Sequence, residues 1–174
     1  LAFLAARIAD HKLPGLLRIV PQLPTLANGK VDGRSVRSTA LGLPDVGLLS
    51  MTEVVAMAER IAAVTNLPTI CDADTGYGGP AMIRRAVEAF IRAGVAGIHI
   101  EDQVSPKRCG HLDDKEMVSR EDFAAKMRAA ADARRSKDFL IIARTDSRAR
   151  HGFEEAIARS NMALEAGADI VFLE

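Results

Sequence analysis

The feature that most constrains the fold is a nine-residue pattern that occurs twice in the second half of the chain. Residues 93–101 read Ala-Gly-Val-Ala-Gly-Ile-His-Ile-Glu, and residues 166–174 read Ala-Gly-Ala-Asp-Ile-Val-Phe-Leu-Glu. In each copy an Ala-Gly turn leads into an apolar stretch that ends on a glutamate. Because each copy follows a stretch with helical periodicity, the pattern predicts repeated helix–turn–strand units.

The same rhythm extends over residues 42–174. The predicted strands end at Asp72, Glu101, Arg144 and Glu174. Strands that are apolar throughout, rather than alternating, are typical of parallel sheets with both faces covered. We therefore expect an α/β fold of the (β/α)8 TIM-barrel type, incomplete, with about five to six βα units present. A doubly wound open sheet is the alternative, but no G-x-G-x-x-G fingerprint follows any predicted strand.

The beginning of the chain does not follow this rhythm. Pro14, Pro21 and Pro24 interrupt any periodic pattern there. We therefore divide the chain into a divergent N-terminal segment, residues 1–40, and a partial (β/α) barrel catalytic domain, residues 41–174. Within the second part, Ser50 with Glu53 predicts a helix start by a capping box. Further helix starts are predicted at Gly79-Pro80, because proline is tolerated in the first turn, and at Ser119 with Asp122.

Composition limits the partners of such a chain. Its 23 basic and 23 acidic residues balance and form no basic stripe with interleaved aromatic residues, so no nucleic acid partner is expected. No apolar run reaches the roughly 18 residues of a membrane span, so no membrane partner is expected. Cys71 and Cys109 form neither a Cys-x-x-Cys pair nor a disulfide framework. This indicates an intracellular protein, cytoplasmic or, in a eukaryote, mitochondrial.

Three carboxylates are predicted to meet where neighbouring strands end. Asp72 and Asp74 follow one strand and would share a face if that strand continues, and Glu101 ends the next strand. Such hard oxygen ligands suit Mg²⁺ or Mn²⁺ rather than zinc. The alternative is that these residues are solvated loop acids or helix caps.

The loop after Glu101 carries reactive side chains in direct succession, Lys107-Arg108-Cys109-Gly110-His111. Neighbouring cations favour the thiolate form of Cys109. This cysteine can therefore act as a nucleophile or as a proton donor or acceptor, and His111 could bind a carboxylate. The alternatives are an inert cysteine in a turn and a surface histidine.

Two further candidates lie at strand ends. Arg144 is suited to bind a carboxylate with two parallel hydrogen bonds, unless it only forms a salt bridge with Asp146 or another neighbour. Glu174 ends its strand as Glu101 does. His99 lies within an apolar strand, and we interpret it as structural.

Taken together, these motifs resemble the isocitrate lyase/phosphoenolpyruvate mutase superfamily. The matching segments are residues 41–45, 72–79, 99–103, 107–111 and 143–146. The mutase and phosphonopyruvate hydrolase branches generally lack the Cys109-Gly110-His111 sequence. The resemblance therefore points to the lyase branch, in particular to its 2-methylisocitrate lyase-like members.

The resemblance implies a barrel whose Mg²⁺ is held, largely through water molecules, by Asp72, Asp74 and Glu101. It implies cleavage of a carbon–carbon bond in a carboxylate substrate of the 2-methylisocitrate or 2,3-dimethylmalate type through an enolate-like intermediate. The catalytic candidates are then Lys107, Cys109, His111, Arg144 and Glu174. The substrate-binding candidates are Asp45, Gly110, His111 and Arg144. The loop around Cys109 would act as a mobile lid.

Other functions share these motifs. Carboxyphosphonoenolpyruvate mutase and oxaloacetate hydrolase are the alternatives within the superfamily. The family carries Tyr-x-Ser-Gly for a substrate carboxylate where this chain has Val31-Asp32-Gly33, and Asp32 would repel that group. Strands seven and eight have no counterpart in these residues, so a truncated, non-catalytic family member is a further alternative. Homo-oligomers are expected for the full-length family but are doubtful for this chain.

Overall fold

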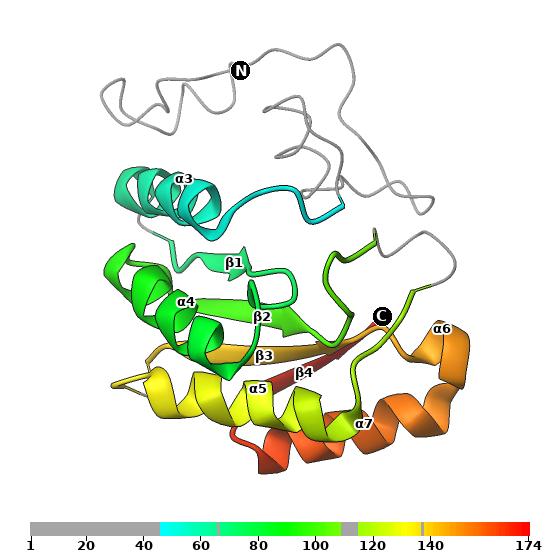
Figure 1. The fold of residues 1–174 in the computed structure, drawn as a ribbon. Coiled ribbons are helices and arrows are strands. Elements are labelled where there is room, and N and C mark those ends of the chain that lie inside the picture. The colour runs from blue at the N-terminus through cyan, green and yellow to red at the C-terminus, as the bar shows by residue number, and fades with distance from the viewer. Residues whose placement is uncertain (1–45, 66, 109–114, 137) are drawn as a thin grey trace.

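The computed structural model describes residues 46–174, except residues 66, 109–114 and 137 (Figure 1). The proposed divergent segment, residues 1–40, lies outside the described residues, as do Asp32 and the site candidates Asp45, Cys109, Gly110 and His111. Helices and strands alternate along the described chain. In order they are α3 (Met51–Val64), β1 (Ile70–Asp72), α4 (Pro80–Arg92), β2 (Gly97–Glu101), α5 (Arg120–Ala133), β3 (Leu140–Thr145), α6 (Arg148–His151), α7 (Phe153–Glu165) and β4 (Ile170–Leu173).

The described strands form one parallel sheet in the order β1-β2-β3-β4. Each strand pairs with the next strand in sequence, and at least one helix lies between them. A doubly wound sheet reverses its strand order at a switch point, whereas a (β/α) barrel adds each strand beside the previous one. The parallel α/β architecture is therefore confirmed, and the strand order is that of the barrel.

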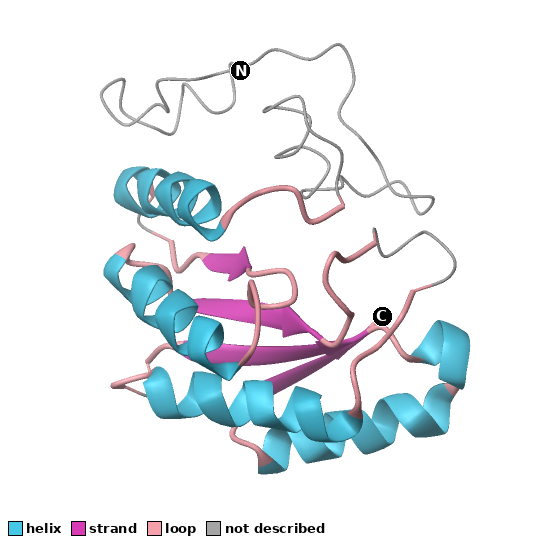
Figure 2. Cartoon of the chain, in the orientation of Figure 1, coloured by secondary structure: helices cyan, strands magenta, loops and turns pink. Residues whose placement is uncertain are grey.

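The helices form a layer against this sheet (Figure 2). α4 contacts α5, α5 contacts α7, and these helices also contact strands β2, β3 and β4. Fully buried side chains from both layers form the core, among them Phe90 and Phe123 of the helices and Ile98 and Ile141 of the strands. Burying a side chain of this size stabilises the fold by roughly 1.5–3 kcal/mol. None of the described helices is long and apolar enough to cross a membrane.

The predicted helix starts are confirmed where local signals marked them. The Ser50 hydroxyl accepts a hydrogen bond from the Glu53 N–H at 3.3 Å, and Glu53 Oε2 accepts one from the Ser50 N–H at 2.8 Å. Pro80 is the first residue of α4, and the Ser119 hydroxyl caps α5 by accepting from the Asp122 N–H at 3.0 Å. These caps fix where each strand–helix loop ends.

The expectation that both faces of every strand are covered fails at β4. Ile170 and Phe172 are 44% and 43% exposed, whereas β2 and β3 are buried along nearly their whole length. β4 is an edge of the described sheet, so it has a described neighbour on one side only. Its apolar side chains therefore lack the cover that the central strands receive. Cys71 of β1, by contrast, is buried.

Candidate active site at the carboxyl ends of the strands

The strand ends that the sequence singled out meet at one edge of the sheet. Asp72 is paired in register with His99, and Glu101 with Arg144. Glu174 directly follows β4. Because the strands are parallel, their carboxyl ends all lie at this edge. The edge therefore combines several carboxylates with a guanidinium group.

The ammonium group of Lys107 lies among three carboxylates. Its Nζ lies 2.8 Å from Asp74 Oδ1, and its side chain is only 1% exposed. Burial alone would lower the pKa of Lys107, but the negative charges of Asp74, Glu101 and Asp72 raise it above its ordinary value. Lys107 is therefore protonated at neutral pH, and the three carboxylates surround a common centre of positive charge.

The loop between β1 and α4 positions Asp74 in a way that the sequence did not predict. β1 ends at Asp72, and Asp74 has a φ of +49°, so the two aspartates do not share a strand face. Instead, the Asp74 N–H donates to Asp72 Oδ1 at 2.9 Å, and the Asp74 carbonyl accepts from the Glu101 N–H at 2.8 Å. A left-handed backbone costs a non-glycine residue roughly 1–2 kcal/mol. These hydrogen bonds offset that cost and keep Asp74 close to Asp72.

The guanidinium of Arg144 is buried among acidic side chains. Its Nη2 lies 2.7 Å from Asp146 Oδ1 and 3.7 Å from Glu174 Oε2, and its Nη1 lies 3.6 Å from Glu101 Oε2. The salt bridge with Asp146, considered as the alternative to a substrate clamp, is thus present. Arg144 Nε has no hydrogen-bond partner among the described residues. Arg144 can therefore still donate to a ligand at this edge.

A buried network behind Arg144 depends on Asp102, which was not among the predicted site residues. Asp102 Oδ2 accepts from Thr145 Oγ1 at 2.6 Å and from Arg159 Nη1 at 3.2 Å, and its Oδ1 accepts from the Asp146 N–H at 3.0 Å. Burial raises the pKa of Asp102, and these hydrogen bonds oppose that shift. The network joins β2, β3 and α7, and it fixes the residue that pairs with Arg144. The available signal was the second acid of the Glu101-Asp102 pair.

Two more basic side chains reach this edge of the sheet. His99 Nδ1 lies 3.5 Å from Asp72 Oδ1, although its place within an apolar strand suggested a structural role. Lys115 Nζ lies 3.4 Å from Asp146 Oδ1, and its side chain is 7% exposed. Lys115 follows the long loop after Glu101 and had no local sequence signal that could have identified it.

The carboxylates at this edge have the donor chemistry that Mg²⁺ requires. Asp72, Asp74 and Glu101 offer oxygen atoms only, and Mg²⁺ binds such groups while keeping several of its water molecules. Across the described part of the chain, no group of three or more histidine, cysteine, aspartate or glutamate side chains could hold a metal ion directly. Binding through water molecules is therefore the mode that this arrangement fits, at a position that already attracts the Lys107 ammonium group.

A family model for phosphoenolpyruvate phosphomutase matches residues 35–174 of the chain. The chain is 49% identical over 142 residues to 2,3-dimethylmalate lyase of Eubacterium barkeri, a match that covers 82% of this chain and 49% of that protein. It is 44% identical over 183 aligned positions to a probable 2-methylisocitrate lyase of Corynebacterium glutamicum, covering 99% of this chain and 58% of that protein. The chain thus spans about half the length of the curated relatives that it matches.

Solved structures show the same likeness in three dimensions. The crystal structure of a 2,3-dimethylmalate lyase, described as a PEP mutase/isocitrate lyase superfamily member, matches with a TM-score of 0.78 and 45% identity, covering 83% of this chain and 49% of that chain. A structure of phosphonopyruvate hydrolase in complex with oxalate and Mg²⁺ matches with a TM-score of 0.73 and 33% identity, covering 80% and 48%. An oxaloacetate acetylhydrolase structure matches with a TM-score of 0.77 and 44% identity, covering 82% and 49%.

Proposed function

The chain belongs to the phosphoenolpyruvate phosphomutase family of the PEP mutase/isocitrate lyase superfamily. From this premise we propose that it acts as a Mg²⁺-dependent carbon–carbon lyase. The substrate is a 2-hydroxy di- or tricarboxylate of the 2-methylisocitrate or 2,3-dimethylmalate type. The relatives named as lyases of these two compounds, at 44% and 49% identity, support this choice.

One observation carries the proposal, namely that three carboxylates and two buried cations gather at one edge of the sheet. Asp72, Asp74 and Glu101 surround the ammonium of Lys107, and Arg144 lies beside Glu101 at 3.6 Å. A polycarboxylate substrate requires cations, and an oxygen-bound divalent metal requires carboxylates. This edge offers both within a small, largely buried region.

We assign the metal to Asp72, Asp74 and Glu101, acting through water molecules. When bound, Mg²⁺ supplies Lewis-acid stabilisation of the negative charge that develops on the substrate oxygens. The structure of phosphonopyruvate hydrolase with oxalate and Mg²⁺ supports a metal of this kind in the superfamily.

The cations have separate roles in this proposal. Lys107 is buried beside Asp74, and we assign its ammonium group to stabilise negative charge on the substrate rather than to act as a base. Arg144 Nε donates a hydrogen bond to a substrate carboxylate, while Asp146 and Glu174 hold the rest of the guanidinium in place. Both cations are buried, and in a water-poor site such charges act more strongly than in solvent.

The remaining roles come from the sequence resemblance. Cleavage turns the 2-hydroxyl group into the carbonyl of pyruvate, so the hydroxyl loses its proton and the electron pair of the broken carbon–carbon bond stays on the other fragment. We assign the thiol of Cys109 to protonate that carbon, and the proton released from the hydroxyl restores the thiol, so that no proton is gained or lost overall. In this step the S–H bond breaks and a C–H bond forms. His111, Gly110 and Asp45 are assigned to substrate binding on the same basis. Lys107 connects the described site to the loop that carries Cys109, Gly110 and His111.

The proposal is tested by supplying the whole protein with Mg²⁺ and each of three substrates in separate reactions. Cleavage of 2-methylisocitrate or of 2,3-dimethylmalate releases pyruvate, together with succinate or propionate respectively. Hydrolysis of oxaloacetate instead releases oxalate and acetate. Pyruvate release that depends on Mg²⁺ is the expected result. Oxalate formation without pyruvate release would instead assign the oxaloacetate hydrolase activity that one similar structure represents.

Two variants serve as controls in this assay. Cys109→Ser removes the proposed proton donor and should abolish most of the turnover. Cys71→Ser changes a buried thiol within β1 that has no role in the proposed chemistry, so turnover should persist. The lyase assignment fails if well-folded protein releases no pyruvate from either substrate, or if Cys109→Ser is as active as the unmodified protein.

A further inference from the structure

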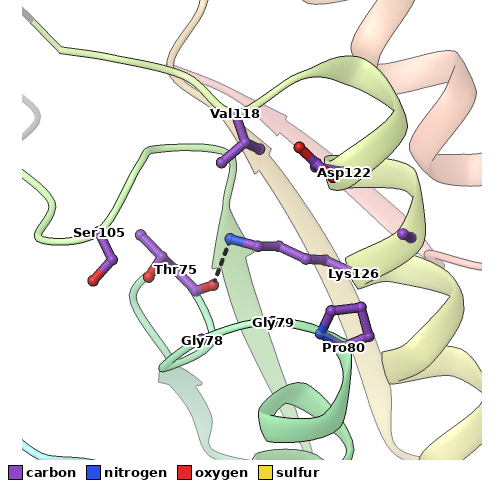
Figure 3. A pocket seen from close by; sticks show the side chains of 9 residues that line it. Thr75, Gly78, Gly79, Pro80, Ser105, Val118, Asp122 and Lys126 are labelled. Atoms are coloured by element: carbon purple, nitrogen blue, oxygen red, sulfur yellow. Dashed lines mark hydrogen bonds between the residues drawn. The ribbon is translucent and has the colours of Figure 1, made fainter.

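A buried lysine crosses a cavity beside the loop between β1 and α4. Lys126 of α5 is only 8% exposed, and its Nζ donates a hydrogen bond to the carbonyl of Thr75 at 3.1 Å. Figure 3 shows the side chain extending from α5 to this carbonyl. The cavity has a volume of about 190 Å³. Thr75 directly follows Asp74, so the bond joins α5 to the loop next to a proposed metal-binding residue.

The loop is held by tight packing in one place and borders the cavity in another. A Cβ atom at Gly76 would lie 1.8 Å from Ile83 Cδ1, so the Ile83 side chain packs closely against the backbone there. Thr75 and Gly78 instead line the cavity. The hydrogen bond from Lys126 therefore holds the loop backbone at Thr75, whereas packing against Ile83 holds it at Gly76.

A lysine is a costly residue for this position, which indicates that its ammonium group has a specific use. Burial lowers the pKa of Lys126, and the negative charges of Asp102, Asp122 and Glu101 only partly oppose that shift. A methionine has nearly the same length and would fill the space without the cost of burying a charge. What methionine lacks is a donor that can reach the Thr75 carbonyl.

We propose that Lys126 is a positioning residue that holds the carboxylate of Asp74 at the proposed Mg²⁺ site. Asp74 has a left-handed backbone, and two long-range hydrogen bonds hold the chain at its carbonyl and at the next carbonyl. Its own carbonyl accepts from the Glu101 N–H at 2.8 Å, and the next carbonyl accepts from Lys126. Strained backbone persists only where its surroundings enforce it. Without Lys126 the loop relaxes, and the Asp74 carboxylate is no longer held in the position from which it binds the metal. This inference rests on the proposed metal site.

The test compares Lys126→Met with Met127→Ala in the whole protein. Met127 is the next residue of α5 and is fully buried in the core, so its truncation destabilises the same helix but leaves the hydrogen-bond donor of Lys126 in place. Mg²⁺ is titrated into each variant by calorimetry, well below the melting temperature. The expected result for Lys126→Met is a dissociation constant raised roughly 10- to 100-fold, as is usual for groups that orient metal ligands. Met127→Ala should bind Mg²⁺ as the unmodified protein does.

Chemical rescue provides a readout that general destabilisation does not affect. Lys126→Ala removes three methylene groups and the ammonium, which propylammonium can replace through the adjoining cavity. Exposed Ser105 and Asp122 at the cavity wall leave it a route of entry. Propylammonium should restore Mg²⁺ affinity, whereas tetramethylammonium at equal concentration has no N–H donor and should not.

Amide hydrogen exchange without metal separates this inference from the proposed function. The Asp74 and Gly76 amides, which bond to Asp72 Oδ1 and to the Ala73 carbonyl, should exchange faster in Lys126→Met than in Met127→Ala. Unchanged exchange, unchanged Mg²⁺ affinity, or equal losses of affinity in both variants would overturn the positioning role. Absence of Mg²⁺ binding to the unmodified protein would instead overturn the proposed metal site, while the exchange rates would still decide whether Lys126 holds the loop.

Discussion

Lys107 Nζ lies 2.8 Å from Asp74 Oδ1, so the base of the long loop after β2 is tied to the loop after β1. This ion pair joins a proposed catalytic residue to a proposed metal-binding residue. It also means that the ammonium group and Mg²⁺ are attracted to the same carboxylates. The two cations therefore influence each other, which leads to a measurable expectation.

Lys107→Met should strengthen Mg²⁺ binding while it abolishes most turnover. Removal of the ammonium leaves Asp72, Asp74 and Glu101 without the charge that now compensates them, so Mg²⁺ should raise the melting temperature more in the variant than in the unmodified protein. Loss of a buried cation that stabilises developing charge should reduce kcat by roughly 10²- to 10³-fold. Arg108→Met is the matched control, because it removes an adjacent but exposed cation. Weaker Mg²⁺ binding in Lys107→Met would contradict this expectation.

Asp102→Asn should destabilise the protein far more than the small change in side-chain size suggests. The substitution keeps an oxygen that can accept from Thr145, but it removes the buried negative charge that faces Arg159 Nη1, so that Arg159 keeps only its ion pair with Glu155. Breaking a buried pair in this way costs roughly 3–5 kcal/mol, and urea unfolding would measure it. The control is Asp132→Asn, which breaks the exposed ion pair with Arg84 and should cost no more than about 1 kcal/mol. Similar losses in the two variants would show that the Asp102 network contributes little.

The sequence predicted the parts of this structure that depend on local signals. Ser50, Ser119 and Pro80 mark helix starts because capping chemistry involves residues only three or four positions apart. The strand ends at Asp72 and Glu101 were also correct, because parallel strands place their carboxyl ends together whatever the details of packing.

The contacts that complete the site depend on pairs distant in sequence, and no local pattern encodes them. Arg159 reaches Asp102 across 57 residues, and Lys126 reaches Thr75 across 51. The left-handed backbone of Asp74 likewise depends on a hydrogen bond to Glu101 of the neighbouring strand. Each contact requires the sheet and helices to be assembled first. The types of residue in the site could therefore be predicted, but not the network that orients them.

Glu155 should make the stability of the protein sensitive to acid. Hydrogen bonds from Arg120 and Arg159 lower its pKa to about 2, from an ordinary value of 4.5. A carboxyl group with a lowered folded-state pKa stabilises the fold above the unfolded-state pKa, and this contribution is lost as the pH falls through the folded-state value. The loss should therefore run from about pH 5 down to about pH 2. Urea unfolding at a series of pH values would measure it.

Glu155→Gln is the variant that isolates this effect. On unfolding at about pH 3, it should take up about one proton fewer than the unmodified protein, so its stability should change less steeply with pH. Glu154→Gln replaces the neighbouring acid of α7 and serves as the control, with the acid dependence expected to persist. An unchanged pH dependence in Glu155→Gln would mean that the ion pairs with Arg120 and Arg159 do not stabilise the folded state.

Gly76→Ala should be strongly destabilising, for two separable reasons. Gly76 has a φ of +86°, and its new Cβ would lie 1.8 Å from Ile83 Cδ1. Gly152 has nearly the same φ, +85°, but a Cβ there meets nothing within 4 Å. Gly152→Ala therefore measures backbone strain without a clash, roughly 1–3 kcal/mol, because a φ of 85° with a ψ of 172° is adopted almost only by glycine. Gly76→Ala should add roughly 1–3 kcal/mol of overpacking to that value.

A double variant distinguishes the clash from the strain at Gly76. Ile83→Val removes the Cδ1 atom that the new methyl group would meet, and alone it should cost roughly 0.5–1.5 kcal/mol. Combined with Gly76→Ala it should relieve the clash, so the double variant is more stable than the sum of the two single losses implies. Strictly additive losses in urea unfolding would show that the loop shifts away from Ile83 instead. Because Gly76 lies two residues after Asp74, such a shift should also weaken Mg²⁺ binding in Gly76→Ala.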